Sequence, residues 1–221
     1  MSIMKKIYAL NGSPRSNGNT ALILKKALEG AASAGAEVEF IDLIKLNFSG
    51  CKSCFECKRK GSKNFGKCAL KDDFSPVLEK LQQADGIIMG SPVYFGGETG
   101  LYRNALERLF FPVLRYTAPP GSAAGKKVNF AFVYTMNIPE SAIPEYGYKE
   151  TLEKTLKFPE LVFKSNPAEV LYVCDTYQFS DYSLYESSLF DPEHKKLMRD
   201  QQFPIDLAKA FAMGKRLAEK N

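Results

Sequence analysis

One stretch near the N-terminus restricts the fold of this chain more than any other, because it joins two strands through a helix. Residues 6–10 form an apolar run that predicts a buried strand, and a polar turn ends it. Between residues 20 and 33 apolar side chains recur at helical spacing, and Asn19 or Thr20 is expected to cap this helix. Alternating residues at 38–43 predict the second strand. Such a unit implies a right-handed crossover between parallel strands.

The rest of the chain continues this alternation of strands and helices. Further strands are predicted at 86–90, 127–135 and 169–174. Helices are predicted around Leu78 and Leu81, and at 101–111, 152–158 and 206–220. Alternation of this kind gives a doubly wound parallel sheet. We therefore predict an α/β protein with a five-stranded parallel sheet.

A single domain over residues 1–221 is predicted. This length suits one well-buried α/β domain, and no internal repeat or linker divides the sequence. Residues 44–73 have little periodicity and are predicted to be a long cysteine-rich loop, which is uncommon in a compact domain unless it is functional. Insertions on the same domain are expected at about 112–126, 136–150 and 176–203.

Composition and charge exclude several classes of protein. No apolar run approaches the ~20 residues that cross a bilayer, and the N-terminal apolar stretch is too short for a signal peptide. The net charge of +5 is mild, and its basic residues gather around the cysteines between 51 and 71, unlike a nucleic-acid arm. We therefore expect a cytoplasmic protein with no nucleic-acid and no membrane partner.

The turn between the first strand and the first helix has the chemistry of a phosphate site. Such a turn points free backbone N–H groups and the positive end of the helix dipole at a ligand. Arg15 adds a charged fork suited to phosphate oxygens. Neutral donors surround it: Ser13, Ser16, Asn17, Asn19 and Thr20. The pattern is neither the Walker sequence nor Gly-x-Gly-x-x-Gly, so one terminal phosphate is expected, with an ordinary capped turn as the alternative.

A second loop, residues 90–100, follows the third strand and is expected beside the phosphate turn. In open α/β sheets ligands bind outside the carboxyl ends of the strands, near the switch in strand order. Tyr94 and Phe95 offer flat faces, and glycines such as Gly96 let the backbone approach a planar ring. The segment Thr135-Met136-Asn137 ends the fourth strand and is expected to reach the same crevice. The alternatives are a Gly-rich turn with core aromatics and, for Thr135, plain strand-end packing.

Four of the five cysteines lie close together in the sequence. Cys51, Cys54 and Cys57 are spaced by three, and Cys68 follows after ten further residues. Without a recognisable secretion signal, such clustering favours metal or redox chemistry over structural disulfides. Four thiolates can hold an iron–sulfur cluster, whose negative charge the neighbouring lysines would offset, or Zn²⁺. Free thiols or a reversible disulfide in a loop are the alternative.

The two loops together carry a family resemblance. The motif Asn11-Gly12-Ser13-Pro14-Arg15-x-x-Gly18-Asn19-Thr20, combined with Ser91-Pro92-Val93-Tyr94-Phe95-Gly96, resembles the NADPH-dependent FMN reductase and iron–sulfur flavoprotein group. The resemblance extends through Asp72 to Arg108 and covers roughly the first half of the chain. It implies a flavodoxin-like fold, which is an α/β three-layer sandwich with the strand order 2-1-3-4-5. It also implies flavin mononucleotide (FMN) as cofactor, and a homodimer or homotetramer.

The resemblance also implies roles for residues. Ser13, Arg15, Asn19 and Thr20 bind the FMN phosphate in this interpretation, and Pro92, Val93, Tyr94, Phe95 and Gly96 line the isoalloxazine ring. Iron–sulfur flavoproteins hold a [4Fe–4S] cluster on Cys-x-x-Cys-x-x-Cys followed closely by a fourth cysteine. Cys51, Cys54 and Cys57 match this pattern, whereas Cys68 lies further along than it usually allows. Related reductases without a cluster also keep some of these cysteines.

The expected function is that of an FMN-dependent oxidoreductase. NAD(P)H, or ferredoxin if a cluster is present, delivers electrons to FMN, which passes them to a quinone, a flavin or another small acceptor. The flavin carries the chemistry, so no catalytic side chain is assigned, and the single histidine, His194, is expected at a surface helix start. The alternatives are a non-enzymatic flavodoxin-like electron carrier, which the basic net charge disfavours, and a thiol or metal sensor built on the cysteine loop.

Overall fold

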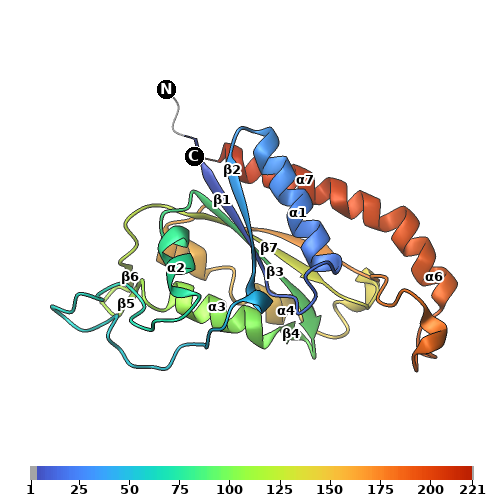
Figure 1. Ribbon diagram of the computed structural model, residues 1–221, viewed down its shortest axis with the longest axis horizontal. Helices are drawn as coiled ribbons and strands as arrows, with labels where there is room; N and C mark the ends of the chain where they lie inside the picture. The colour runs from blue at the N-terminus through green and yellow to red at the C-terminus, as the bar shows by residue number, and fades with distance from the viewer. Residues whose placement is uncertain (1–3, 221) are drawn as a thin grey trace.

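A parallel sheet forms the centre of the computed structural model, which describes residues 4–220 (Figure 1). Its five strands lie side by side in the order β2 (Glu37–Asp42), β1 (Lys6–Asn11), β3 (Gly86–Tyr94), β7 (Asn129–Thr135) and β8 (Glu169–Val173). The two-residue strand β4 (Gly97–Glu98) pairs antiparallel with the end of β3. This arrangement confirms the predicted strand number and the predicted order 2-1-3-4-5.

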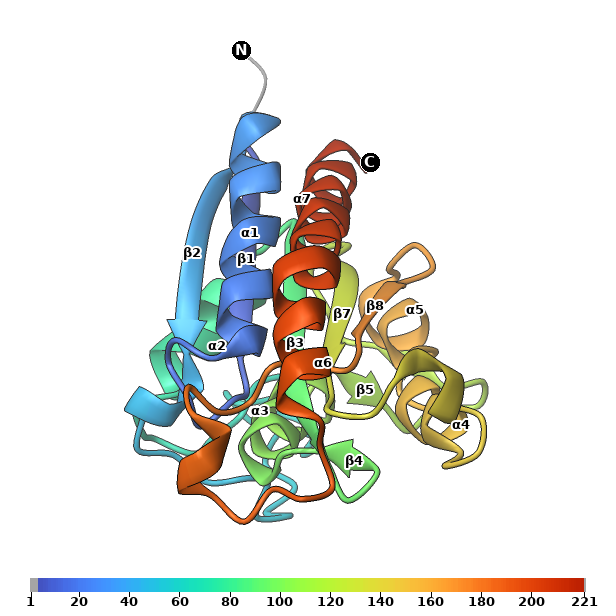
Figure 2. The same ribbon diagram turned by 90° about the vertical axis from the view of Figure 1, so that its right-hand side faces the viewer.

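Helices cover both faces of the sheet (Figures 1 and 2). One face carries α1 (Asn19–Ser33) and α7 (Phe203–Glu219). The other carries α2 (Ser75–Leu81), α3 (Gly100–Phe110), α4 (Tyr148–Glu153) and α5 (Phe158–Phe163). Successive strand residues supply the two cores in turn: Ile7 packs under α1 and α7, and Tyr8 packs on the opposite side. Both sheet faces are thus apolar, as parallel strands covered on two sides require.

The helices α1 and α7 pack with their backbones in contact. A Cβ added at Gly30 would lie 1.9 Å from the carbonyl oxygen of Phe211, and one added at Gly214 would lie 1.8 Å from that of Ala27. Figure 2 shows the two helices side by side over the sheet. Only glycine leaves room for this approach at the two positions.

Two features of the sequence-based helix predictions are wrong. The single helix predicted at 152–158 is two helices, because α4 ends at Glu153 and α5 begins at Phe158, with Pro159 in its first turn. The helix α1 begins at Asn19 after Gly18, which gives it no side-chain cap, so neither predicted residue caps it. The predicted long loop contains no helix or strand between Leu46 and Phe74.

The carboxyl-terminal part of the chain and the remaining short elements complete the fold. The helix α6 (Pro192–Leu197) continues through a π-helical turn into α7, which begins at Phe203 rather than at the predicted Asp206. A small hairpin of β5 (Leu114–Arg115) and β6 (Gly121–Ser122) lies in the predicted insertion 112–126. Among residues 4–220, no helix is both long and apolar enough to cross a membrane.

The close approach of α1 and α7 gives a prediction about stability. Gly214→Ala should lower the free energy of unfolding by about 1–3 kcal/mol, because the added methyl group overpacks the interface. Alanine is the better helix former, so propensity alone predicts the opposite sign. Urea unfolding measures the change. Gly125→Ala is the matched control, since a Cβ there meets no heavy atom within 4 Å; equal stabilities of the two variants would contradict the interpretation.

Candidate functional site

A cavity of about 580 Å³ opens where β1, β3 and β7 end. Nine of the twelve residues predicted to bind a cofactor line it: Ser13, Arg15, Asn19, Thr20, Pro92, Val93, Tyr94, Phe95 and Thr135. The other three, Ser16, Asn17 and Gly96, are not among its lining residues. The cavity lies outside the carboxyl ends of parallel strands, next to the β1–β3 switch in strand order, where open α/β sheets bind ligands.

The turn that leads into α1 leaves backbone donors free at one end of this cavity. The first N–H of the helix with a backbone acceptor belongs to Leu22, which donates to the carbonyl oxygen of Gly18 at 3.1 Å. The turn is held in shape by Asn11 Oδ1, which accepts from the N–H of Ser13, and by Ser13 Oγ, which accepts from the N–H of Arg15. An uncapped helix N-terminus with several free N–H groups suits a phosphate monoester.

Polar side chains of the same turn hold the 176–203 insertion over it. Arg15 Nη1 donates to the carbonyl oxygen of Gln178 at 2.9 Å, and Asn19 Nδ2 donates to that of Tyr177 at 2.9 Å. On the inner side, Thr20 Oγ1 and Thr135 Oγ1 lie 2.7 Å apart in a buried hydrogen bond. Arg15 and Asn19 therefore border the cavity while their donors contact carbonyl oxygens.

A tight hairpin forms the opposite end of the cavity. Phe95 and Gly96 connect β3 to β4 with φ values of 52° and 82°, as a two-residue hairpin turn requires. Glycine adopts this conformation freely, whereas Phe95 adopts it at a cost. The Phe95 ring is fully exposed and Tyr94 is 48% exposed. Flat aromatic surface thus lines the mouth of the cavity.

The far wall of the cavity comes from Met136 and Asn137, which were expected at this crevice, and from residues of the 176–203 insertion that the sequence analysis did not assign to a site. It consists of Met136, Asn137, Thr176, Gln178, Phe179, Glu186 and Phe190. Asn137 Nδ2 donates to Gln178 Oε1 at 2.8 Å, and its Oδ1 is buried without a hydrogen-bond partner among the described residues. Such an orphaned acceptor suits an N–H group of a bound ring. The 176–203 insertion has no hydrophobic periodicity, so no sequence pattern indicated that its residues would lie here.

A buried ion pair between Asp175 and Lys195 contacts the far wall. Asp175 hydrogen-bonds to Lys195 and, at 2.6 Å, to His194 Nε2. Lys195 Nζ also donates to the carbonyl oxygen of Asn137 at 2.7 Å. Burial raises the pKa of the Asp175 carboxyl, but these hydrogen bonds and charges outweigh it and hold the pKa below its ordinary value. His194 lies in the first turn of α6 as expected, and the pairing with Asp175 was not foreseen.

The four clustered cysteines line a second, narrow cavity of about 20 Å³ against the end of α3. Its walls also include Phe55, Leu70, Phe111 and Pro112. The backbone N–H of Gly66 donates to the carbonyl oxygen of Cys57 at 3.0 Å. This hydrogen bond closes the loop of residues 58–67, so that Cys68 lines the same cavity as the other three cysteines. The long spacing therefore does not separate the four thiols.

Each of the five cysteines, all within the described residues, is a free thiol. Between residues 4 and 220, no three His, Cys, Asp or Glu side chains are arranged to hold a metal ion. Cys174 lies outside the group, and burial raises its pKa to about 12.

The sequence and the fold resemble known flavoproteins. The family model described as NADPH-dependent FMN reductase matches residues 5–155. An iron–sulfur flavoprotein of Methanocaldococcus jannaschii is 42% identical over 103 residues, which are 47% of this chain and 51% of that protein. One of Archaeoglobus fulgidus is 40% identical over 103 residues, 47% of this chain and 48% of that protein. The chain spans about half the length of the curated relatives it matches.

Solved structures show the fold over nearly the whole chain. An NAD(P)H:quinone oxidoreductase from Methanothermobacter marburgensis has a TM-score of 0.69 at 18% identity, covering 97% of this chain and 100% of that one. An FMN-dependent NADH-azoreductase from Bacillus anthracis, solved with FMN, has a TM-score of 0.65 at 11% identity, with coverages of 97% and 100%. At these identities the likeness establishes the flavodoxin-like fold.

The ion pair under the cavity gives a prediction about pH. Asp175→Asn should lower the free energy of unfolding by about 3–5 kcal/mol at neutral pH, because it leaves Lys195 buried without its charge partner. The folded pKa of Asp175 lies below the unfolded value of about 4, so the contribution is complete above pH ~4 and is lost as the pH falls through the folded pKa.

Urea unfolding between pH 3 and 7 measures this effect. The difference in the free energy of unfolding between wild type and Asp175→Asn should become smaller at the acid end of this range. Asp200→Asn, which changes an exposed carboxyl group nearby, is the control and should leave stability within about 0.5 kcal/mol of wild type. If this difference in the free energy of unfolding stays constant over the whole pH range, the destabilisation by Asp175→Asn comes from packing and not from charge.

Proposed function

This chain belongs to the NADPH-dependent FMN reductase family, whose cofactor is FMN, and we propose that it is an oxidoreductase that passes electrons from NAD(P)H to a small acceptor. The observation that supports this most is the single cavity of about 580 Å³ that joins the phosphate-type turn to the aromatic hairpin. Its two ends match the two ends of FMN, a phosphate monoester and a planar ring. In this proposal the buried Oδ1 of Asn137, which has no partner among the described residues, accepts a hydrogen bond from an N–H group of the ring.

This chain's own residues would hold FMN by both ends. The free N–H groups at the start of α1 receive the phosphate, and Arg15 adds a charged donor. Backbone N–H groups of the 93–97 hairpin meet the polar edge of the ring, where they stabilise negative charge. When bound, FMN supplies reversible acceptance of a hydride. The Thr20–Thr135 hydrogen bond closes the inner side of the site.

The exposed aromatic mouth supports a planar partner for the flavin. The nicotinamide of NAD(P)H and an acceptor such as a quinone or a second flavin are both planar, and both suit Tyr94 and Phe95. Exposed apolar side chains also occur in the segment that forms the far wall, at Leu184 and Leu189, so we propose a homodimer or homotetramer in which a second chain covers part of this segment. The acceptor, the choice of NADH or NADPH, and the assembly are parts of this proposal.

We further propose that Cys51, Cys54, Cys57 and Cys68 hold a [4Fe–4S] cluster. The shared cavity supports this proposal, as does the name iron–sulfur flavoprotein given to the relatives. The narrow space requires the thiols to spread outward. Cys54 is the exposed cysteine of the four and lies between Ser53 and Phe55, which have positive φ values of 51° and 56°. With a cluster present, ferredoxin is the proposed electron donor.

The phosphate assignment is tested by combining Arg15→Ala with Thr20→Ala. The dissociation constant for FMN, measured by fluorescence quenching, should rise at least tenfold, because one lost charge-assisted hydrogen bond costs about 1.5–3 kcal/mol. The matched control combines Arg115→Ala with Thr117→Ala, two exposed residues at the β5–β6 hairpin. An unchanged FMN affinity in the first variant would contradict the assignment.

The cluster is tested by iron and acid-labile sulfide assays on anaerobically purified protein, with an absorbance spectrum. The wild type should contain about four irons per chain and flavin bands with a shoulder near ~400 nm. Cys68→Ser should lose the iron and keep FMN, whereas Cys174→Ser should keep both. Flavin without iron in the wild type would leave an FMN reductase with free thiols. Steady-state NAD(P)H oxidation then separates an enzyme from a carrier or a sensor.

A further inference from the structure

Arg108 is a buried cation beside the cysteine cavity. It lies in the last turn of α3, and none of its side chain is exposed to solvent. Removing a guanidinium from water costs several kcal/mol unless anions and hydrogen-bond acceptors surround it. An apolar side chain would fill the same space without this cost. The contacts of Arg108 should therefore indicate what the charge is for.

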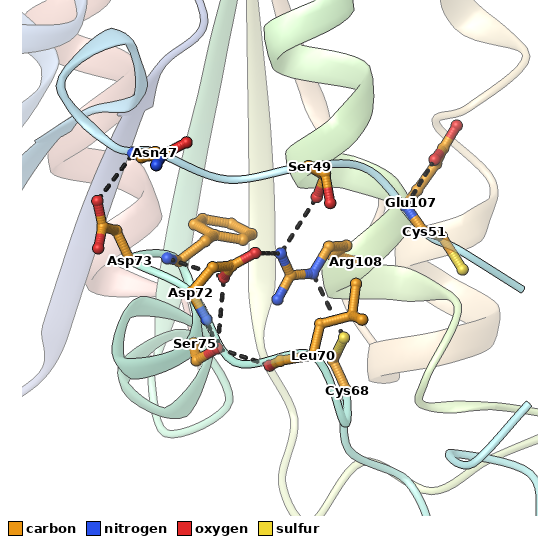
Figure 3. A network of polar contacts seen from close by, with 11 residues as sticks. Asn47, Ser49, Cys51, Cys68, Leu70, Asp72, Asp73, Ser75, Glu107 and Arg108 are labelled. Carbon is orange, nitrogen blue, oxygen red and sulfur yellow. Dashed lines mark hydrogen bonds and ion pairs between the residues drawn. The ribbon is translucent and has the colours of Figure 1, made fainter. Parts of the chain in front are cut away.

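The guanidinium joins three parts of the long loop (Figure 3). Its Nη1 donates to Asp72 Oδ2 at 2.5 Å and to the carbonyl oxygen of Ser49 at 3.1 Å. Its Nε donates to the sulfur of Cys68 at 3.3 Å. Burial raises the pKa of the Asp72 carboxyl, but the hydrogen bond and charge of Arg108 outweigh it and hold the pKa below its ordinary value.

Two nitrogens of the guanidinium, Nη2 and Nε, lack a strong hydrogen-bond acceptor. Arg108 Nη2 is buried and has no hydrogen-bond partner among the described residues. A neutral thiol is a weak acceptor, so the bond from Nε to Cys68 is weak while the sulfur carries no charge. A metal-bound thiolate is a charged acceptor and makes this bond roughly twice as strong. The site is therefore better matched to an anionic group on the four cysteines than to four free thiols.

We propose that Arg108 is a positioning residue that orients Cys68 toward the other three cysteines and raises the reduction potential of the group they hold. This inference rests on the cluster proposed above. Reduction of such a group takes up one electron and adds one negative charge. A fixed positive charge at hydrogen-bond distance from a ligand sulfur stabilises the reduced form, as hydrogen bonds to cluster sulfurs do in general. Asp72 opposes this effect by partly neutralising the guanidinium.

A purely structural role for Arg108 makes a different prediction. A brace that only holds Ser49, Cys68 and Asp72 together would weaken when either charged partner is changed, and both changes would act in the same direction. An electrostatic role requires opposite signs. Losing the cation disfavours reduction, whereas losing the carboxylate frees the cation and favours reduction. The sign of the two shifts therefore separates the two roles.

The experiment compares Arg108→Gln, Arg108→Lys and Asp72→Asn with wild type. Iron, acid-labile sulfide and FMN are assayed per chain, and the midpoint potential comes from an anaerobic reductive titration with dithionite and mediators, followed by EPR. The control is Lys67→Gln, which removes the same unit of charge next to Cys68 but at an exposed residue, where water and salt screen it.

We expect Arg108→Gln to reduce the equilibrium constant for one-electron reduction about tenfold, which corresponds to a potential lower by about 59 mV. Asp72→Asn should raise the potential, Arg108→Lys should retain more of the wild-type value than Arg108→Gln, and Lys67→Gln should shift it least. If Arg108→Gln binds no iron, the sign of the Asp72→Asn shift decides the question alone.

Potentials of Arg108→Gln and Asp72→Asn that equal the wild-type value, or that both fall, would overturn the proposed role of Arg108 and leave the cluster intact. A wild type that binds FMN but no iron would overturn the cluster and this role together. These two failures are distinguished by the iron assay on the wild type, before any variant is compared.

Discussion

One buried hydroxyl group, that of Thr99, holds the two loops of the proposed flavin site together. Thr99 Oγ1 donates to the carbonyl oxygen of Gly12 at 2.6 Å and accepts from the N–H of Tyr102 at 3.1 Å, which caps α3. The N–H of Thr99 donates to Ser91 Oγ at 3.0 Å. Gly12 is required here, because a Cβ would lie 2.7 Å from Tyr102 Cβ. Phosphate turn, ring hairpin and α3 therefore form one rigid unit.

This unit also relates the two proposed centres to each other. The helix α3 begins at the hairpin and carries Arg108 at its far end, against the cysteine cavity. Arg108 lies eight positions after Gly100, which is a rise of about 12 Å along an α-helix. Because Thr99 fixes the start of the helix and the buried guanidinium fixes its end, the distance between the flavin site and the four thiols is set by a single element.

Much of the fold and part of the site were predictable from local patterns. The continuous apolar runs at β1, β3 and β7 identify strands buried on both faces, and the turn before α1 identifies a ligand position. The break between α4 and α5 was missed because the apolar pattern continues through it, although Pro159 marked the start of a new helix. The part of the far wall that residues 176–190 supply, with Gln178 and Glu186, was missed because an aperiodic insertion does not indicate where it packs.

The sequence by itself determined the five parallel strands and the chemistry of the phosphate-type turn, because these depend on short-range periodicity and on residue types at adjacent positions. The order of the strands was expected only from the family resemblance, because it depends on pairing between segments far apart in the chain. Only the tertiary structure decided what closes the cavity and where the fourth cysteine lies. Arg15 meets Gln178 across 163 residues, and Cys68 meets Arg108 across 40. Such contacts join irregular segments, whose positions are fixed by packing against the finished sheet and not by any local pattern.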